Sequence, residues 1–124
     1  MIEDINGMKS TGREIKTEYL MRPEVLLDKL DSIDVRILKK FYMAGPKPHD
    51  LSPYVQINLT GELGKSGVLL SVKAVALRLN KLVDLGLLNE SHTTPKIYIP
   101  KEDLKIFARK LIATYSANLG FDLI

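Results

Sequence analysis

Residues 71–90 read SVKAVALRLNKLVDLGLLNE, and they carry the strongest helix signal in the chain. Ser71 can cap a helix, because its hydroxyl can accept a hydrogen bond from a backbone amide of the first turn. The buried stripe of that helix recurs at helical spacing: Val75, Leu79 and Leu82. Gly86 is the residue type that most readily adopts the left-handed conformation at a helix exit. The pattern predicts a helix over residues 71–85 and a short strand directly after it, over residues 87–90.

A second strand and a long helix follow. Residues 91–95 are a polar turn, and residues 96–99 predict a returning strand with Ile97 and Ile99 on one face. A final helix is expected from about Pro100. Its apolar side chains form a broad stripe: Leu104, Phe107, Ala108, Leu111, Ile112, Tyr115 and Leu119.

Helix signals also precede residues 71–90. Residues 1–22 predict a loose N-terminal arm, and Pro23 suits the first turn of a short helix because proline has no amide to leave unpaired there. Asp31 or Ser32 can cap a stronger helix that ends near residue 42. Residues 51–70 are compatible with a strand, but the Ser-Pro pair at their start and the helical spacing favour a helix ending at Gly64.

Composition sets the limits on function. The chain has 124 residues and is 45% hydrophobic, enough for one domain with a real core. It contains no cysteine, and its two histidines lie far apart, so we expect no disulfide, no thiolate nucleophile and no metal site. It carries no apolar segment long enough for a membrane span or a signal peptide, which predicts a cytoplasmic protein.

Charge is unevenly distributed. The net charge is only +3, but residues 1–34 are acidic whereas residues 65–100 carry five basic side chains against two acidic ones. A basic patch of this size is either an ordinary solvated face or a site for a polyanion.

Three helices, with a two-stranded hairpin directly after the third, are the order of a winged helix-turn-helix domain. The stretch LDSIDVRILKKF (residues 30–41) resembles the first helix of Lrp/AsnC-type and MarR-type regulators, and LSVKAVALRLNKLVDLGLL (residues 70–88) resembles their recognition helix. The long turn GKSGVLL before this helix departs from the pattern. The chain is similar to the small single-domain archaeal members, which implies a mainly α fold with a small β-hairpin wing.

The resemblance covers roughly residues 31–100 and implies duplex DNA as the partner. We expect an arm at residues 1–22, a DNA-binding domain at residues 23–100 and a C-terminal dimerisation helix at residues 101–124. The recognition helix would lie in the major groove and the wing on the backbone or in the minor groove. The predicted DNA contacts are Lys65, Ser71, Val72, Lys73, Ala76, Leu77, Arg78, Lys81, His92, Thr93, Thr94 and Lys96.

Two of these cations, Arg78 and Lys81, are expected to contact phosphates. They lie farther along the helix than the base-reading positions. The helix face near its start is apolar where Arg, Asn or Gln would read bases, so it could contact thymine methyl groups or pack against a protein. A sequence-specific regulator, a low-specificity architectural DNA binder and a protein-interaction module therefore all remain open.

The C-terminal stripe predicts a homodimer. A helix over residues 101–119 would be nearly 30 Å long at 1.5 Å per residue, longer than a three-helix core is expected to cover. The predicted dimer interface consists of Leu104, Phe107, Leu111, Ile112, Tyr115 and Leu119. The alternative is that this stripe packs on the first helices of its own chain.

Enzyme activity and cofactors are not expected. Gly64-Lys65-Ser66 matches the end of a phosphate-binding loop, but Leu59 stands where that motif needs glycine. The carboxylates show no paired pattern with apolar shielding of the kind that raises a pKa for catalysis.

Overall fold

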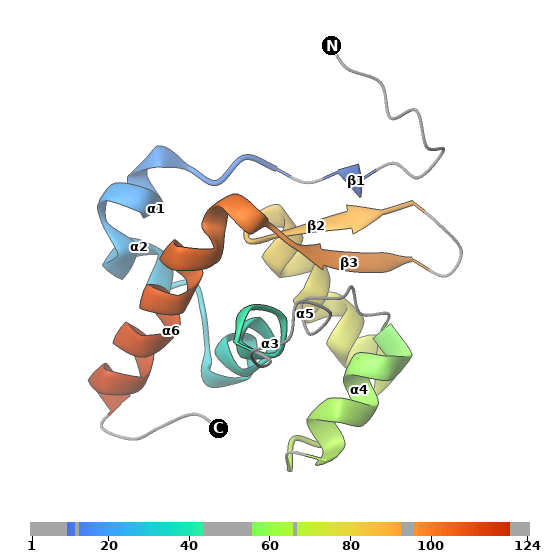
Figure 1. The fold of residues 1–124 in the computed structure, drawn as a ribbon. Helices are drawn as coiled ribbons and strands as arrows, with labels where there is room; N and C mark the ends of the chain where they lie inside the picture. The colour runs from blue at the N-terminus through green and yellow to red at the C-terminus, as the bar shows by residue number, and fades with distance from the viewer. Residues whose placement is uncertain (1–9, 12, 44–55, 66, 93–95, 120–124) are drawn as a thin grey trace.

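Helices make up most of the described chain, and a small antiparallel hairpin and a C-terminal helix complete it (Figure 1). The computed structural model describes residues 10–11, 13–43, 56–65, 67–92 and 96–119. The helices are α1 (Thr17–Met21), α2 (Pro23–Leu27), α3 (Ser32–Tyr42), α4 (Gln56–Lys65), α5 (Val72–Asp84) and α6 (Lys105–Leu119), with a 3-10 turn η2 (Glu102–Leu104) before α6.

The helix boundaries follow local chemistry. Pro23 occupies the first turn of α2, as predicted. Asp31, one of the two predicted caps, is the N-cap of α3 and forms a capping box with Asp34. The ambiguous segment is helical, and α4 ends at Lys65, one residue beyond the predicted end. The Ser52-Pro53 pair predicted to start this helix lies outside the described residues.

The strands form one antiparallel sheet in the order β1-β2-β3. Its strands are β1 (Ser10–Thr11), β2 (Leu88–Ser91) and β3 (Ile97–Pro100). The predicted hairpin is therefore present, but the N-terminal arm adds a third, two-residue strand along β2. The prediction of a loose arm was wrong for this part of residues 1–22, because the edge of β2 offers it backbone hydrogen-bonding groups.

The arm also lies against the exit of α5. Gly86 has a φ of +87°, the left-handed conformation predicted for it. A Cβ placed on Gly86 would lie 2.6 Å from Ile15 Cα and 2.7 Å from Ile15 N. Position 86 therefore requires glycine for two reasons: the left-handed backbone conformation and the close approach of the N-terminal arm.

The core lies where α3 meets α5, α6 and the sheet. In Figure 1, α3 is seen end-on at the centre, with α6 on one side of it and α5 on the other. α3 packs against α6 and β3, and α4 packs against α5. Phe41, Leu38 and Ile37 of α3 are fully buried.

Tyr42 joins three elements inside this core. Its hydroxyl donates a hydrogen bond to the Leu87 carbonyl (2.7 Å) and accepts one from the Lys101 amide (2.8 Å). Burial raises the pKa of Tyr42 to about 12. The end of α3 is therefore fixed to the beginning of β2 and to the residue that follows β3.

Tyr98 occupies the inner face of the hairpin. It is fully buried, whereas Ile97 and Ile99 on either side of it are only partly buried. Its hydroxyl donates to Asn80 Oδ1 of α5 and accepts from Gln56 Nε2 of α4, both at 3.2 Å. This side chain therefore fixes the hairpin to both helices.

Candidate nucleic-acid interface

α5 presents one face to the core and the other to solvent. The Ser71 hydroxyl accepts a hydrogen bond from the Ala74 amide at 3.1 Å, which confirms the predicted cap. The inner face is buried along its whole length: Val75, Leu79, Leu82 and Val83. This packing fixes which side of the helix remains open.

We define the outer face of α5 as Val72, Lys73, Ala76, Leu77 and Asn80, which lie within one arc of about 140° at 100° per residue. Leu77 is 64% exposed and Val72 is 39% exposed. Lys73 is exposed and forms no ion pair with any described residue. Leu69, in the turn before the helix, is 84% exposed. The outer face is therefore aliphatic apart from the cation Lys73 and the amide of Asn80.

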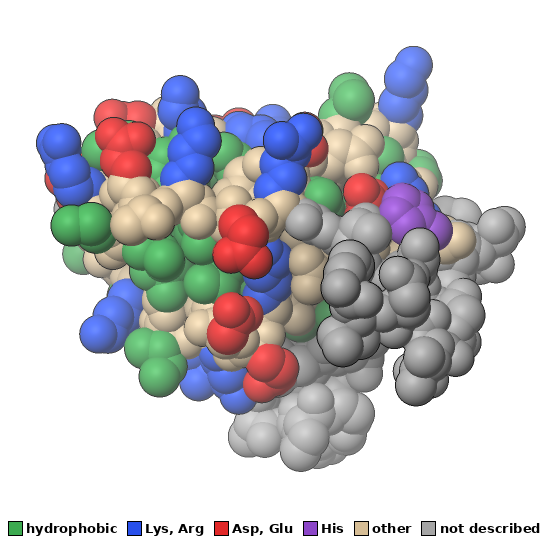
Figure 2. All heavy atoms as spheres, turned by 90° about the horizontal axis from the view of Figure 1, so that it is seen from above, with side chains coloured by type: hydrophobic (Ala, Val, Ile, Leu, Met, Phe, Trp, Pro, Cys, Tyr) green, Lys and Arg blue, Asp and Glu red, His purple; other side chains and the backbone are tan. Residues whose placement is uncertain are grey.

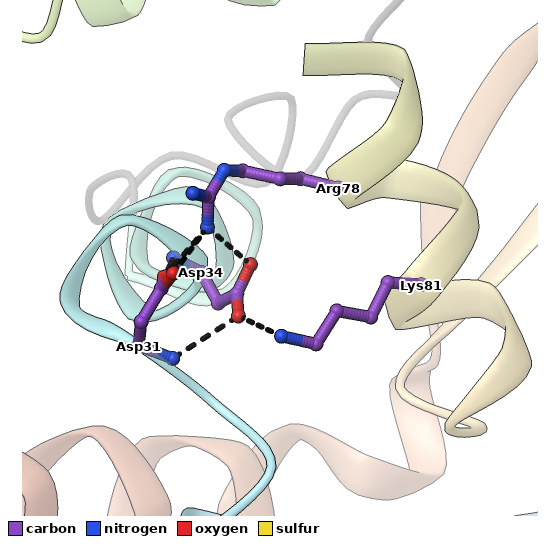
Figure 3. Close-up of polar contacts among 4 residues, drawn as sticks. All are labelled: Asp31, Asp34, Arg78 and Lys81. Atoms are coloured by element: carbon purple, nitrogen blue, oxygen red, sulfur yellow. Dashed lines mark hydrogen bonds and ion pairs between the residues drawn. The ribbon is translucent and has the colours of Figure 1, made fainter. Parts of the chain in front are cut away.

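Arg78 and Lys81, predicted to meet phosphates, instead form ion pairs within the chain (Figure 3). Arg78 Nη1 lies 2.6 Å from Asp31 Oδ1 and 3.0 Å from Asp34 Oδ1. Lys81 Nζ lies 2.5 Å from Asp34 Oδ2. We call these four side chains the Asp31–Asp34 cluster. Both cations point from α5 towards the beginning of α3, away from the outer face.

The physical reason for this arrangement lies in Asp34. Its side chain is fully buried, and it accepts a hydrogen bond from the Asp31 amide at 3.1 Å as part of the capping box. A buried carboxylate is very costly unless cations and hydrogen-bond donors surround it. Arg78 and Lys81 are the cations that satisfy this requirement.

Asp31 is the more exposed carboxylate of the cluster. Partial burial raises the pKa of its carboxyl, but hydrogen bonds from the Arg78 guanidinium and from the Asp34 amide outweigh this effect. The pKa of Asp31 therefore lies below its ordinary value. The carboxylate form is favoured, as an ion pair requires.

Two further predicted cations, Lys65 and Lys96, are also paired. Lys96 Nζ lies 3.0 Å from Glu90 Oε1 across the hairpin, and this carboxylate raises the pKa of Lys96. Lys65 Nζ lies 3.4 Å from Glu62 Oε2 on α4. Of these two lysines, Lys65 is the more exposed, with 77% of its side chain open to solvent. On the face drawn in Figure 2, basic and acidic side chains are likewise interspersed.

The tip of the hairpin is only partly described. His92 is exposed at its beginning. The predicted contacts Thr93 and Thr94 lie outside the described residues.

The stripe predicted to form a dimer interface packs within its own chain. Leu104, Leu111 and Ile112 are 6% exposed or less, and Phe107 and Tyr115 pack against the same core. α6 lies against α3, and it therefore covers the apolar surface that would have been left for a partner. This prediction was wrong for the three buried residues, because α3 and α2 supply the apolar neighbours that the helix needs. The Leu119 side chain lies outside the described part.

Sequence reasoning missed the two carboxylates that engage Arg78 and Lys81. The available signal was the Asp31-x-x-Asp34 spacing, which is a capping-box pattern with two acids. That spacing reveals the helix start but not the partners, because Asp34 and Lys81 are 47 residues apart in sequence.

No family model matches the chain, and neither a curated protein nor a solved structure does. None of the helices in the described part combines the length and apolar character of a membrane span. Among the described residues, no three acidic, histidine or cysteine side chains are grouped in a way that could hold a metal ion.

Proposed function

We propose that this chain is a winged helix-turn-helix protein that binds duplex DNA, as a transcriptional regulator in the cytoplasm. In this proposal α3, α4 and α5 form the three-helix unit and the hairpin β2–β3 is the wing. The order of elements supports it, as does the direct passage from α5 through Gly86 into β2. A helix about 10–12 Å wide fits the major groove.

The observation that carries the proposal is the outer face of α5. This face stays exposed while the opposite face is buried, and the helix lies beside the hairpin. Its first turn contains no acidic residue, so the helix N-terminus and Lys73 present positive charge to a phosphate backbone. Lys73 and Ser71 are therefore the phosphate contacts that we propose, with Val72 and Leu77 facing the bases.

Because of the Asp31–Asp34 cluster, two of the predicted DNA-binding cations are not assigned to DNA. Arg78 and Lys81 instead hold α5 against α3. Their charges also neutralise two carboxylates close to α5, which would otherwise repel phosphates.

The dimeric state belongs to the same proposal. A two-fold dimer would place two recognition helices about 34–36 Å apart, one turn of DNA. Since α6 uses its stripe in its own core, such a dimer would use other exposed apolar side chains. Ile106 on α6 and Met21 on α1 are 72% and 76% exposed.

A second candidate function is docking to a protein. Leu69 and Leu77 are both more than half exposed, which is typical of a surface that contacts a partner. This alternative predicts binding through apolar contact, with little dependence on salt.

Salt dependence separates the two functions. We expect the affinity for a random-sequence duplex, measured by fluorescence anisotropy, to fall steeply as salt rises, because phosphate contacts release counterions. Lys73→Gln should reduce the slope of log affinity against log salt by about 0.9. Lys110→Gln, an exposed lysine of α6, is the matched control and should leave the slope unchanged. Absence of duplex binding at low salt would contradict the proposal.

A further inference from the structure

We infer that the outer face of α5 recognises thymine methyl groups, so the preferred target is duplex DNA rich in A·T pairs. The inference rests on the proposed function and specifies what the helix would read once it lies in the major groove. It follows from which side chains of α5 are free to contact a base edge.

Guanine readout by arginine is not open to α5, and the proposed function assigns Lys73, the lysine of the outer face, to phosphate. The side chain that most often recognises guanine is arginine, which donates two hydrogen bonds to O6 and N7. The arginine of this helix, Arg78, already donates to both oxygens of Asp31 and to Asp34. Releasing it would leave the buried Asp34 with one cation fewer, so this guanidinium stays in the cluster.

Adenine readout is restricted in a similar way. Asparagine recognises adenine through its carbonyl oxygen and its amide group together. The outer face carries one asparagine, Asn80, and its Oδ1 already accepts a hydrogen bond from the Tyr98 hydroxyl at 3.2 Å. The same bond ties α5 to the hairpin and holds the Asn80 amide towards Tyr98, so turning this amide to meet an adenine edge would cost the bond.

Aliphatic side chains are what the outer face offers instead. Leu77 is the most exposed of them at 64%, and Val72 and the partly exposed Ala76 lie on the same outer face. The C5 methyl of thymine is the one apolar group that a base presents in the major groove. Contact between these side chains and a methyl removes both from water, which is worth about fourfold in affinity for each methyl buried.

Charge favours DNA over a protein as the occupant of this face. Lys73 stands between Val72 and Leu77 on the helix surface, and the first turn of α5 has no carboxylate. The nearest carboxylates on α3 are neutralised by Arg78 and Lys81. The outer face of α5 thus combines a small apolar surface with a cation and lacks an unneutralised carboxylate. It is complementary to a major groove that is lined by methyl groups and bordered by phosphates.

The test uses two duplexes of alternating A·T pairs that differ only in carrying thymidine or deoxyuridine. Deoxyuridine lacks the methyl and keeps every hydrogen-bonding group of the base. We expect the full chain to bind the thymidine duplex at least fourfold more tightly at equal salt, in fluorescence anisotropy titrations. A G·C duplex should bind no better than the deoxyuridine one.

Leu77→Ala should remove most of the difference between the two duplexes. Leu77 is exposed, so its truncation should leave the fold intact, which circular dichroism can verify. Leu20→Ala, at an exposed leucine of α1, is the control and should retain the full difference.

The outcomes distinguish the inference from the proposed function. Equal, salt-dependent binding of both duplexes would overturn the methyl recognition and leave DNA binding standing. Absence of binding to either duplex at low salt would overturn both, and would favour a protein as the partner of this face.

Discussion

Lys81 Nζ lies 2.5 Å from Asp34 Oδ2, and the Asp34 side chain has no exposed surface. This pair joins the last part of the exposed helix α5 to the beginning of the central helix α3. With Arg78 and Asp31 it forms a cluster that is at once a helix cap and a bridge between helices. Its role in the proposed DNA-binding domain is to position α5, and two predictions follow from that role.

Loss of both cations should destabilise the fold. In the variant Arg78→Met, Lys81→Met, the one partner that the buried Asp34 carboxylate keeps among the described residues is the Asp31 amide. We expect the free energy of unfolding to fall by about 3 kcal/mol, since breaking a buried pair leaves an uncompensated charge. Urea denaturation measures this change.

The matched control is Lys73→Met, which removes a cation from the outer face of the same helix. Because Lys73 is exposed and unpaired among the described residues, its replacement should change stability by no more than about 0.5 kcal/mol. If the double variant were as stable as this control, the positioning role of the cluster would be disproved.

Asp31 should give the fold part of its acid sensitivity. Its pKa is lowered in the folded chain, so its contribution is fully present above its unfolded pKa of about 3.9 and is lost as the pH falls through the folded value. Asp31→Asn keeps an N-cap side chain but removes the charge. We therefore expect a flatter loss of stability below about pH 4 in urea titrations.

The size of this effect is small, because the Asp31 side chain is 53% exposed and solvent screens the pair. At neutral pH the variant should lose at most about 0.5 kcal/mol. In an Arg78→Met background, Asp31→Asn should have less effect on the loss of folding stability at acid pH. An Asp31→Asn effect that is independent of Arg78 would show that the ion pair is not its origin.

How far the sequence predicts this fold depends on whether a feature is local. The Ser71 cap, the Gly86 exit and the α5 stripe are set by residues within one helix, and all three were predicted correctly. The helical state of α4 was also predicted, although a strand was compatible with the same pattern.

Features that depend on distant partners were not predictable in the same way. Helical spacing shows that Leu111 is on a buried face, but it cannot say whether α3 or a second copy covers that face. Likewise, exposure of Arg78 and Lys81 follows from the helix pattern only if no acidic partner lies opposite. The two-residue strand β1 is too short to leave a pattern at all.

The Tyr42 hydroxyl provides a third prediction. Tyr42→Phe leaves the Leu87 carbonyl and the Lys101 amide without this buried partner, which should lower the free energy of unfolding by about 1–3 kcal/mol. Tyr115→Phe is the control, because that tyrosine is only partly buried on α6. Equal stability of the two variants, in thermal or urea denaturation, would contradict a structural role for the Tyr42 hydroxyl.

Gly86 provides the last prediction, through a comparison with a second glycine of the chain. Gly86→Ala adds a Cβ only 2.6 Å from Ile15 Cα in a residue whose φ is +87°, so the N-terminal arm must move and the backbone is strained. We expect a loss of at least about 1 kcal/mol from the conformational strain alone. Gly61→Ala places the same methyl inside α4 with nothing within 4 Å of it, and alanine is favoured over glycine in a helix by about 1 kcal/mol. The two substitutions should therefore shift the urea midpoint in opposite directions, and a Gly86→Ala variant that matches or exceeds the wild type in stability would show that the arm does not pack on the exit of α5.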